Sequence, residues 1–297
     1  MRLFLANSAS HLQESLRKHS FAVGRIEYYA FADQERGYRL MDDVKGESVG
    51  VIGSVLPDPQ SLFDLMAVHH LARENGARET NLVVPYLGYA RQDRPNRAGE
   101  GSIGVMVAGL LEKIGPSRLT LIDVHSDFIR KAFGPSAGEI SALPLLANAL
   151  VKRPPDVVVS PDAGYLAGAT RLAGLFKPHP DVAVIDKARP RPNMAIARRL
   201  HGDVHGKDIV LVDDMIDTGR TLAEAVRLVT RKGATRIRLA ATHGIFSSDA
   251  RERLSGLPID EILITNTLPQ PCHPKFRILD IGPLIRDALL PGEKPTR

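Results

Sequence analysis

The segment 209–221, with the sequence IVLVDDMIDTGRT, joins an apolar run to two acids and a short loop. Asp213 and Asp214 follow the apolar run, where carboxylates can accept hydrogen bonds from neighbouring sugar hydroxyls. Backbone N–H groups of Thr218–Thr221 open a predicted helix and can bind a phosphate, and Gly219 lets the backbone approach it closely. An ordinary turn capped by aspartate is the alternative, but two acids directly after a buried strand are costly without a ligand. The segment therefore predicts a site for a phosphorylated sugar.

A second group of charged residues, Arg91-Gln92-Asp93-Arg94, lies after another apolar run. The two arginines can neutralise a triphosphate, because the planar guanidinium group matches phosphate oxygens. Taken alone, the four residues are equally typical of a solvated charged loop. His125 is a further polar residue behind an apolar run, and a lone histidine is more often a packing residue than a ligand.

Composition narrows the class of ligand. The 297 residues carry a formal net charge of +5, and the hydrophobic (43%) and charged (25%) fractions are ordinary for a globular protein. Aromatic residues make up only 5%, without tryptophan, so a base-stacking platform for nucleic acid is disfavoured. Because the basic residues are mostly scattered, small phosphorylated ligands are favoured over a polymer.

Cysteine content and hydropathy indicate the compartment. Cys272 is the one cysteine, which excludes an internal disulfide and fits a reducing cytoplasm. No apolar run approaches about 18 residues, so we expect no membrane span. The first ten residues, MRLFLANSAS, contain too short an apolar stretch for a secretory signal. We expect a cytoplasmic protein with neither a membrane nor a nucleic-acid partner.

The elements that position these residues are predicted by short apolar runs separated by helical stretches. Runs of this kind are typical of parallel strands buried on both faces, which predicts an α/β fold with ligands at the carboxyl ends of the strands. The runs are Val49–Ile52, Leu82–Val84, Leu119–Ile122, Val157–Val159, Val182–Ile185, Ile209–Val212, Ile237–Ala240 and Glu261–Thr265.

Helix signals lie between the runs. A helix is predicted from the Pro57-Asp58-Pro59 sequence to about Asn75, where Gly76 can close it. Another begins near Thr221, ends at Gly233 and has one apolar face, formed by Leu222, Ala225, Val226 and Val229. The sequence Lys-Arg-Pro-Pro at 152–155 resembles a linker, so we expect two similar domains, 1–150 and 151–297.

The segment Asp213–Thr221 resembles the phosphoribosyl-binding signature of the type I phosphoribosyltransferase superfamily. Further segments resemble one family within it, the ribose-phosphate pyrophosphokinases, and follow that family's order over nearly the whole chain. These segments are Ala30–Glu35, Val84–Arg94, Ile122–Ser126, Val159–Gly164, Ala241–Ser247 and Thr265–Pro269. Each is weakly or moderately specific alone, and the combination is highly specific.

The resemblance implies two phosphoribosyltransferase-like domains, each a mainly parallel sheet flanked by helices. It implies transfer of the β,γ-diphosphoryl group of Mg·ATP to the 1-hydroxyl of ribose 5-phosphate, giving phosphoribosyl pyrophosphate and AMP. Ribose 5-phosphate binding is implied for Asp213, Asp214, Asp217, Thr218, Gly219, Arg220 and Thr221. ATP binding in the first domain is implied for Phe31, Asp33, Glu35, Arg91, Gln92, Asp93 and Arg94.

Two further implications concern the metal and the assembly. By resemblance, His125 and Asp162 are ligands of Mg²⁺, an ion that keeps several waters and needs few protein groups. In the family, the segment around Phe31 reaches into the ATP site of a neighbouring subunit, which implies a homo-oligomer, either a dimer or a hexamer.

The segment Val184–Asn193, rich in proline and basic residues, resembles the family's flexible catalytic loop, which closes over the phosphates. Lys187 and Arg189 match its two key cations and would stabilise charge on the transferring group. A basic surface loop without a catalytic role is the alternative interpretation.

Three positions depart from the family's usual pattern. Ala188 replaces the middle cation of the catalytic loop, Arg220 lies within the phosphate loop, and Gly99–Val105 differs from a segment near the allosteric sites of many members. Arginine at position 220 is familiar in some phosphoribosyltransferases, so a transferase that consumes phosphoribosyl pyrophosphate is one alternative. A catalytically weak homologue that regulates a true synthetase is another, motivated by Ala188 and the altered segment.

Overall fold

The computed structural model describes residues 1–95, 97–191 and 194–290, with only the backbone described at 187–191 and 194–198. The chain forms two compact units. The first contains Met1–Ser141, Thr267–Pro269 and the segment from Asp280 onward, and the second contains Ala142–Asn266 and Gln270–Leu279. The expected division into functional domains, 1–150 and 151–297, stays a prediction.

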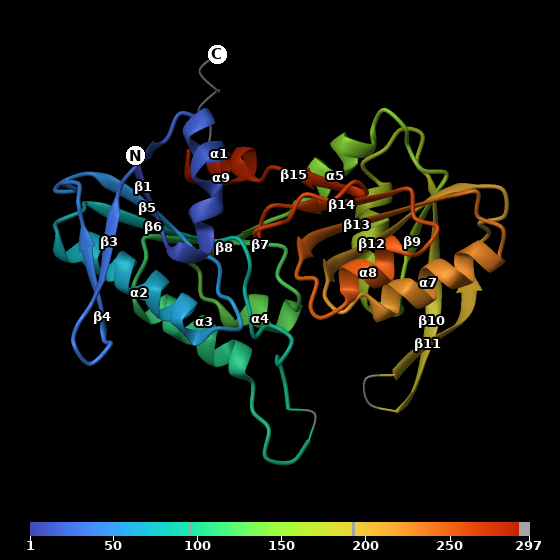
Figure 1. Ribbon diagram of the computed structural model, residues 1–297, viewed down its shortest axis with the longest axis horizontal. Coiled ribbons are helices and arrows are strands. Elements are labelled where there is room, and N and C mark those ends of the chain that lie inside the picture. The colour runs from blue at the N-terminus through green and yellow to red at the C-terminus, as the bar shows by residue number, and fades with distance from the viewer. Residues whose placement is uncertain (96, 192–193, 291–297) are drawn as a thin grey trace. The chain divides into compact units, whose positions relative to one another are not determined.

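The first unit is built on a six-stranded parallel sheet in the order β2-β1-β5-β6-β7-β8 (Figure 1). Its strands are β1 (Arg2–Leu5), β2 (Ala22–Val23), β5 (Ser48–Ile52), β6 (Glu79–Val84), β7 (Arg118–Ile122) and β8 (Ala137–Ile140). The central strands are almost wholly buried, as continuous apolar runs require.

Helices cover both faces of this sheet. They are η1 (Asn7–Leu12), α1 (Gln13–Lys18), α2 (Pro59–Glu74), α3 (Ile103–Lys113), α4 (Asp127–Ala132) and α9 (Gly282–Leu289). Helices α2 and α3 share one core cluster with the sheet, whereas α9 lies with α1 on the other face (Figure 1). A hydrogen bond of 2.6 Å from Ser15 to Asp280 links α1 to the residues just before α9.

An antiparallel hairpin, β3 (Ile26–Ala30) and β4 (Arg36–Leu40), forms a separate two-stranded sheet in the first unit. The turn between the strands, residues 31–35, is exposed. Figure 1 shows the hairpin in blue beside α2. It therefore carries the segment around Phe31 that the sequence singled out.

The second unit has a seven-stranded sheet in the order β11-β10-β9-β12-β13-β14-β15. Its strands are β9 (Val157–Ser160), β10 (Asp181–Arg191), β11 (Met194–His201), β12 (Asp208–Ile216), β13 (Arg236–Gly244), β14 (Glu261–Thr265) and β15 (Phe276–Leu279). All neighbours are parallel except β11, which is antiparallel to β10. The helical elements are α5 (Leu143–Leu150), η2 (Ala163–Tyr165), α6 (Leu166–Ala173), α7 (Arg220–Arg231) and α8 (Ala250–Ser255).

Alternation along each strand divides the second unit's core into two layers. Val157 and Val159 of β9 pack in the cluster that contains α7 and α8. Val158 packs in the other cluster, with α5 and α6. Successive side chains of a strand point to opposite faces, so a sheet covered on both sides needs an unbroken apolar run.

The predicted fold class is confirmed, and all eight apolar runs lie in strands. The two predicted helices are also confirmed. Asp58 caps α2 by accepting a hydrogen bond from the Gln60 N–H at 3.1 Å, and Gly76 adopts φ +83° beyond its end. The predicted apolar face of α7 is buried. In the described part of the chain, no helix has the length and apolar character of a membrane span.

Candidate functional site

The phosphate loop, residues 217–221, follows β12 in the second unit and includes the first two residues of α7. Gly219 is the residue before the helix and adopts φ +66°, a left-handed conformation that glycine reaches without steric cost. Its carbonyl accepts the hydrogen bond of the Ala223 N–H at 2.8 Å, which begins the helical ladder. The N–H groups in the first turn of this 12-residue helix have no acceptor within the helix, and such N–H groups are where helices can bind anions.

The two acids before this loop lie inside the strand, because β12 continues to Ile216. The sequence had placed Asp213 and Asp214 at the end of a shorter run. Asp213 is paired with Ala241 of β13 and is half-buried, whereas Asp214 is 7% exposed. Asp213 Oδ1 accepts a hydrogen bond from the Asp214 N–H at 3.0 Å. Two carboxylates are thus held on a rigid strand directly before the phosphate loop.

Arg253 of α8 braces the phosphate loop, a role that the sequence did not predict. Its Nη1 donates to the Thr218 carbonyl, and its Nη2 forms an ion pair with Asp249 at 2.6 Å. The hydrogen bond from Arg253 lowers the pKa of the Asp249 carboxyl below its usual value. The spacing of these two residues, i and i+4 on a helix start, is the one sequence signal for the brace.

In the first unit, Arg91–Arg94 lies in a turn region after β6. Arg91 and Arg94 are exposed, and the Gln92 carbonyl accepts hydrogen bonds from the Gly104 N–H at 3.2 Å and the Ser102 hydroxyl at 3.4 Å. Ser102 is the N-cap of α3. The altered segment Gly99–Val105 therefore positions the arginine-bearing turn through its contacts with Gln92.

The same turn is joined to the segment containing His125. Asp93 Oδ2 accepts a hydrogen bond of 2.6 Å from Ser126, which also caps α4. Asp123 is 9% exposed and adopts φ +38°, a conformation that is uncommon for non-glycine residues. His125 is exposed. The structure thus brings two of the predicted segments together.

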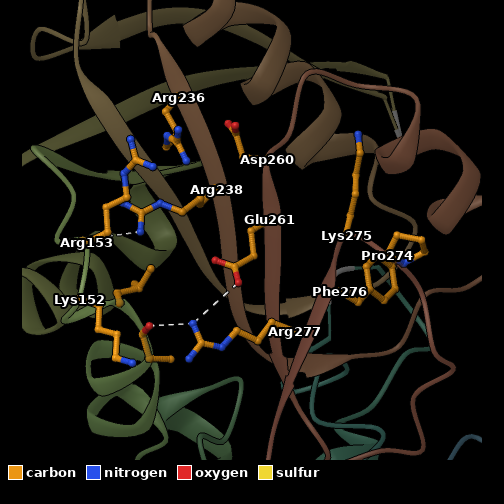
Figure 2. Close-up of a pocket in the computed structure, with 12 residues that line it drawn as sticks. Lys152, Arg153, Arg236, Arg238, Asp260, Glu261, Pro274, Lys275, Phe276 and Arg277 are labelled. Atoms are coloured by element: carbon orange, nitrogen blue, oxygen red, sulfur yellow. Dashed lines mark hydrogen bonds and ion pairs between the residues drawn. The ribbon is translucent and has the colours of Figure 1, made fainter.

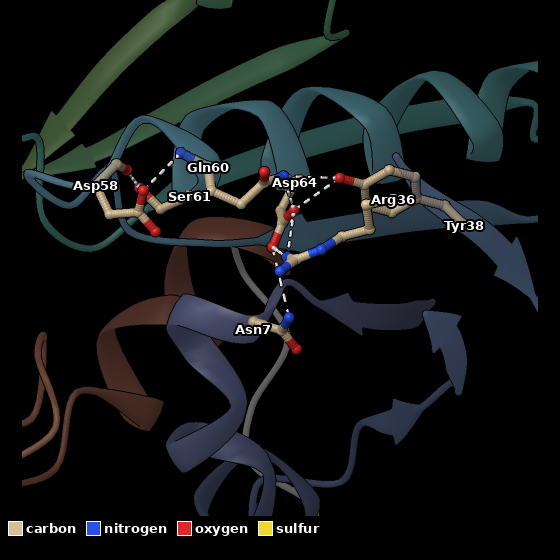
Figure 3. A network of polar contacts seen from close by, with 7 residues as sticks. All are labelled: Asn7, Arg36, Tyr38, Asp58, Gln60, Ser61 and Asp64. Atoms are coloured by element: carbon tan, nitrogen blue, oxygen red, sulfur yellow. Dashed lines mark hydrogen bonds and ion pairs between the residues drawn. The ribbon is translucent and has the colours of Figure 1, made fainter. Parts of the chain in front are cut away.

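A polar network anchors the hairpin that carries Phe31, Asp33 and Glu35 (Figure 3). At its centre is Asp64 of α2, which is 2% exposed. It accepts hydrogen bonds from Arg36 Nη1 at 2.8 Å and the Tyr38 hydroxyl at 2.8 Å. Burial and the hydrogen bond to Asp64 raise the pKa of the Tyr38 phenol.

The hairpin tip has a defined backbone. The Phe31 N–H donates to the Glu35 carbonyl at 2.8 Å, and Asp33 Oδ1 accepts from the Glu35 N–H at 3.0 Å. The Phe31 ring is 51% exposed and makes an edge-to-face contact with Tyr29, with centroids 5.3 Å apart. The Phe31 ring is therefore exposed on a tip whose backbone is fixed by hydrogen bonds.

The two predicted magnesium ligands belong to different units, His125 to the first and Asp162 to the second. Asp162 caps η2, where its Oδ1 accepts from the Gly164 N–H at 2.9 Å and the Tyr165 N–H at 3.3 Å. Within the described ranges, no three histidine, cysteine or acidic side chains gather as a metal-binding group. The assignment of His125 and Asp162 as magnesium ligands stays a prediction.

Lys187 and Arg189 lie in the backbone of β10, which extends to Arg191. The sequence had placed them in a loop after a shorter strand. Lys187 is paired with Ala197 of β11, and the register shifts between Asp186 and Lys187. Their catalytic roles stay predictions.

Comparisons with known proteins decide the family. Residues 1–115 match the N-terminal domain of ribose phosphate pyrophosphokinase, and residues 178–290 match the phosphoribosyl synthetase-associated domain. A ribose-phosphate pyrophosphokinase of Caldanaerobacter subterraneus is 35% identical, with 98% of this chain and 94% of the relative covered. The chain belongs to the ribose-phosphate pyrophosphokinase family.

Other relatives agree with this assignment. The ribose-phosphate pyrophosphokinase of Aquifex aeolicus is 36% identical, with 87% of this chain and 85% of the relative covered. The crystal structure of phosphoribosylpyrophosphate synthetase from Mycobacterium smegmatis is similar with a TM-score of 0.87, at 32% identity and 97% coverage of both chains. The predicted family, fold and enzyme class, ribose-phosphate diphosphokinase, are confirmed.

Proposed function

We propose that the phosphate loop of the second unit holds ribose 5-phosphate for diphosphoryl transfer from ATP. The observation that carries the proposal is the left-handed Gly219 at the start of α7, directly behind two acids on β12. The N–H groups of the loop would bind the 5-phosphate, and the helix dipole favours its negative charge. Asp213 and Asp214 would accept hydrogen bonds from the sugar hydroxyls.

The proposed binding set around this loop also includes Asp217, Thr218, Arg220 and Thr221. Thr218 and Thr221 would add hydroxyl donors. Arg220 is exposed at the first helical position and would add a cation to the phosphate site. The brace from Arg253 to the Thr218 carbonyl supports a preformed loop.

ATP would bind to the first unit. Arg91 and Arg94 would neutralise the triphosphate, while Gln92 and Asp93 would hold the turn and orient the nucleotide. Phe31, Asp33 and Glu35 would recognise the adenine of ATP bound to a neighbouring copy, so the working enzyme is proposed to be a homo-oligomer, a dimer or a hexamer. The exposure of the hairpin tip in one chain supports this part of the proposal.

In the proposed reaction, the sugar's 1-hydroxyl oxygen forms a bond to the β-phosphorus of ATP. The bond from that phosphorus to the oxygen bridging the α- and β-phosphates breaks, AMP leaves with its electron pair, and the hydroxyl proton passes to solvent. Positioning and charge stabilisation supply most of the rate enhancement. Lys187 and Arg189 would stabilise the charge on the transferring group.

Mg²⁺ is the proposed cofactor, and His125 and Asp162 are the residues that would hold it. When bound, the ion would neutralise negative charge on the ATP phosphates. A cytoplasmic location is proposed as well, and the exposed free thiol of Cys272 fits a reducing compartment.

The test is to incubate the full chain with Mg·ATP, with and without ribose 5-phosphate, and to separate the nucleotides by ion-exchange chromatography. AMP that forms only with the sugar supports the proposal. ADP instead of AMP would mean transfer of a single phosphate and would contradict it. Absence of turnover, with and without inorganic phosphate, would favour either a phosphoribosyltransferase or the regulatory homologue that Ala188 and the altered segment Gly99–Val105 suggest.

A further inference from the structure

A hollow of about 360 Å³ lies at the amino-terminal edge of the second unit's sheet, where β13, β14 and β15 begin (Figure 2). The end of α5 and the residues after it complete its wall. Its lining has six cationic side chains and only two acidic ones, Asp260 and Glu261. The cations are Lys152, Arg153, Arg236, Arg238, Lys275 and Arg277. We name this set the cationic hollow.

One carboxylate forms ion pairs with three of these cations. Asp208, at the start of β12, forms ion pairs with Arg238 at 2.8 Å, Arg153 at 3.2 Å and Arg236 at 3.7 Å. Three guanidinium groups with one acid leave an excess of two positive charges. Such an excess raises the energy of the folded state unless an anion compensates it.

The buried member of the group has unused donor capacity. Arg238 is 4% exposed, and its Nη atoms donate to the Arg153 carbonyl and to Asp208, both at 2.8 Å. Its Nε–H has no hydrogen-bond acceptor within the described residues. A buried donor without an acceptor is costly, so a guanidinium held in this way indicates a site that a ligand completes.

Lys152 and Arg277 approach the hollow from a second side, whereas Lys275 lies apart and donates to the carbonyls of Ser255 and Leu257 (Figure 2). Lys152 has no ion-pair or hydrogen-bond partner in the described chain. Arg277 Nη1 donates to the Ala149 carbonyl at 2.9 Å and lies 3.8 Å from Glu261. Arg153 and Arg277 have exposed side chains, at 59% and 49%, so their remaining N–H donors can reach a ligand. Positive charge is therefore presented at two separate places.

The cationic hollow is remote from the phosphate loop. Strand β12 runs from Asp208 beside the hollow to Ile216 just before the loop. At about 3.3 Å per residue, eight steps along a strand separate the two ends by roughly 26 Å. A molecule in the hollow cannot also contact Gly219, so the hollow is a second site in the same unit.

We propose that the cationic hollow binds a small anion that carries two or more phosphate groups. Arginine side chains match phosphate oxygens with paired donors, and the two groups of cations suit charge at both ends of a short ligand. The confined volume favours a small molecule over a nucleic acid, and Phe276 is the one aromatic residue in the lining. This inference does not depend on the proposed catalytic roles.

The experiment is isothermal titration of inorganic pyrophosphate into the full chain without added metal. The double variant Lys152→Gln/Arg236→Gln removes two cations from the hollow while leaving the buried Arg238 in place. The matched control is Arg231→Gln/Lys232→Gln, which removes the same charge from the exposed end of α7 outside the hollow. A parallel titration with ADP tests whether the anion is inorganic or a nucleoside diphosphate.

We expect the wild type and the control to bind with the same affinity at the hollow, and the hollow variant to bind at least tenfold more weakly there. Binding at the phosphate loop would remain in all three proteins and appear as a separate event. ADP binding that the hollow variant loses would identify a nucleotide site, whereas loss of pyrophosphate binding alone would identify an inorganic one. Equal stoichiometry and affinity for both probes in all three proteins would overturn the proposal.

Discussion

The Ser126 hydroxyl donates a hydrogen bond of 2.6 Å to Asp93, and this contact joins two segments that are 33 residues apart. One segment carries Arg91 and Arg94, and the other carries Asp123 and His125. Ser126 also accepts from the Phe128 N–H at 3.2 Å, so the cap of α4 and the link to Asp93 share one hydroxyl. The proposed ATP and metal segments are therefore positioned as one piece.

Replacing Ser126 with alanine removes both contacts at once. We expect the KM for ATP to rise about fivefold, and the free energy of unfolding to fall by about 1 kcal/mol, a typical effect of losing a helix cap. Steady-state kinetics and urea unfolding measure the two effects. The variant Ser126→Thr keeps the hydroxyl and should restore both. An unchanged KM for ATP in Ser126→Ala would refute the linking role.

Gly219→Ala tests the phosphate loop. The new Cβ would lie 3.1 Å from Leu254 Cγ, and alanine at φ +66° costs about 1–2 kcal/mol, so the loop should change conformation. We expect the KM for ribose 5-phosphate to rise at least tenfold. Gly206→Ala is the matched control, because Gly206 also has a positive φ, +70°, but its added Cβ would contact nothing within 4 Å. The loop assignment fails if both variants bind the sugar phosphate equally well.

Asp64 is expected to position the hairpin tip. In Asp64→Asn, the buried group can no longer pair with Arg36, so the hairpin should loosen and the unfolding free energy should fall by about 2 kcal/mol. If the tip recognises adenine, the KM for ATP should rise severalfold while the KM for ribose 5-phosphate stays the same. Equal changes in both KM values would indicate general loss of structure. Gln60→Ala, which removes another donor to Asp64 but leaves Arg36 and Tyr38 in place, is the milder control.

Because His69 is buried, we expect the free energy of unfolding to fall in acid. Burial, together with the nearby charges of Arg73 and His70, lowers the pKa of His69 to about 4, and neither ring nitrogen has a hydrogen-bond partner in the described chain. The unfolded state, with a pKa of about 6.5, binds the proton more readily. The contribution of His69 to the free energy of unfolding is therefore constant above pH 6.5. It falls by up to about 3 kcal/mol as the pH drops towards 4.

The variant His69→Leu should flatten this pH dependence. It removes the titrating group and fills the buried site with apolar atoms, so we expect unchanged or higher stability at pH 7. Urea unfolding at pH 7 and pH 5 measures the difference. A wild type and variant that lose the same free energy between the two pH values would contradict the assignment.

Lys187→Ala and Arg189→Ala address the proposed stabilisation of the transferring group. Each should lower kcat by roughly 10²- to 10³-fold, in the range seen when one transition-state donor is removed. Ribose 5-phosphate binding, measured by equilibrium dialysis, should stay close to that of the wild type. A large loss of sugar phosphate binding in either variant would assign these cations to substrate binding instead.

The central strands were predictable because burial on both faces imposes continuous apolar runs such as Val157–Val159. The edge strands were not. For example, β8 contains Gly138 and Glu139 and is only partly buried, so its sequence has neither a run nor an alternation. It becomes a strand because it pairs with β7, and such pairing cannot be read from a local pattern.

In the candidate site, too, some features could be predicted from the sequence and others could not. The positive φ of Gly219 follows from a glycine in a turn before a helix, so the sequence could indicate it. The contact from Arg253 to Thr218 spans 35 residues and depends on how α8 packs against α7. The anchoring of Arg36 by Asp64 depends in the same way on the packing of the hairpin against α2. Contacts of this kind appear only when the tertiary structure is known.

The return of Asp280 and α9 to the first unit has a consequence for biosynthesis. The hydrogen bond from Ser15 to Asp280 can form only after Asp280 has been synthesised. The hydrogen bond from Arg118 to the Ala288 carbonyl likewise requires that Ala288 has been synthesised. During translation the second unit, which ends at Leu279, therefore has all its strands before the first unit receives its last helix. The half of the protein that is synthesised first is the half that is completed last.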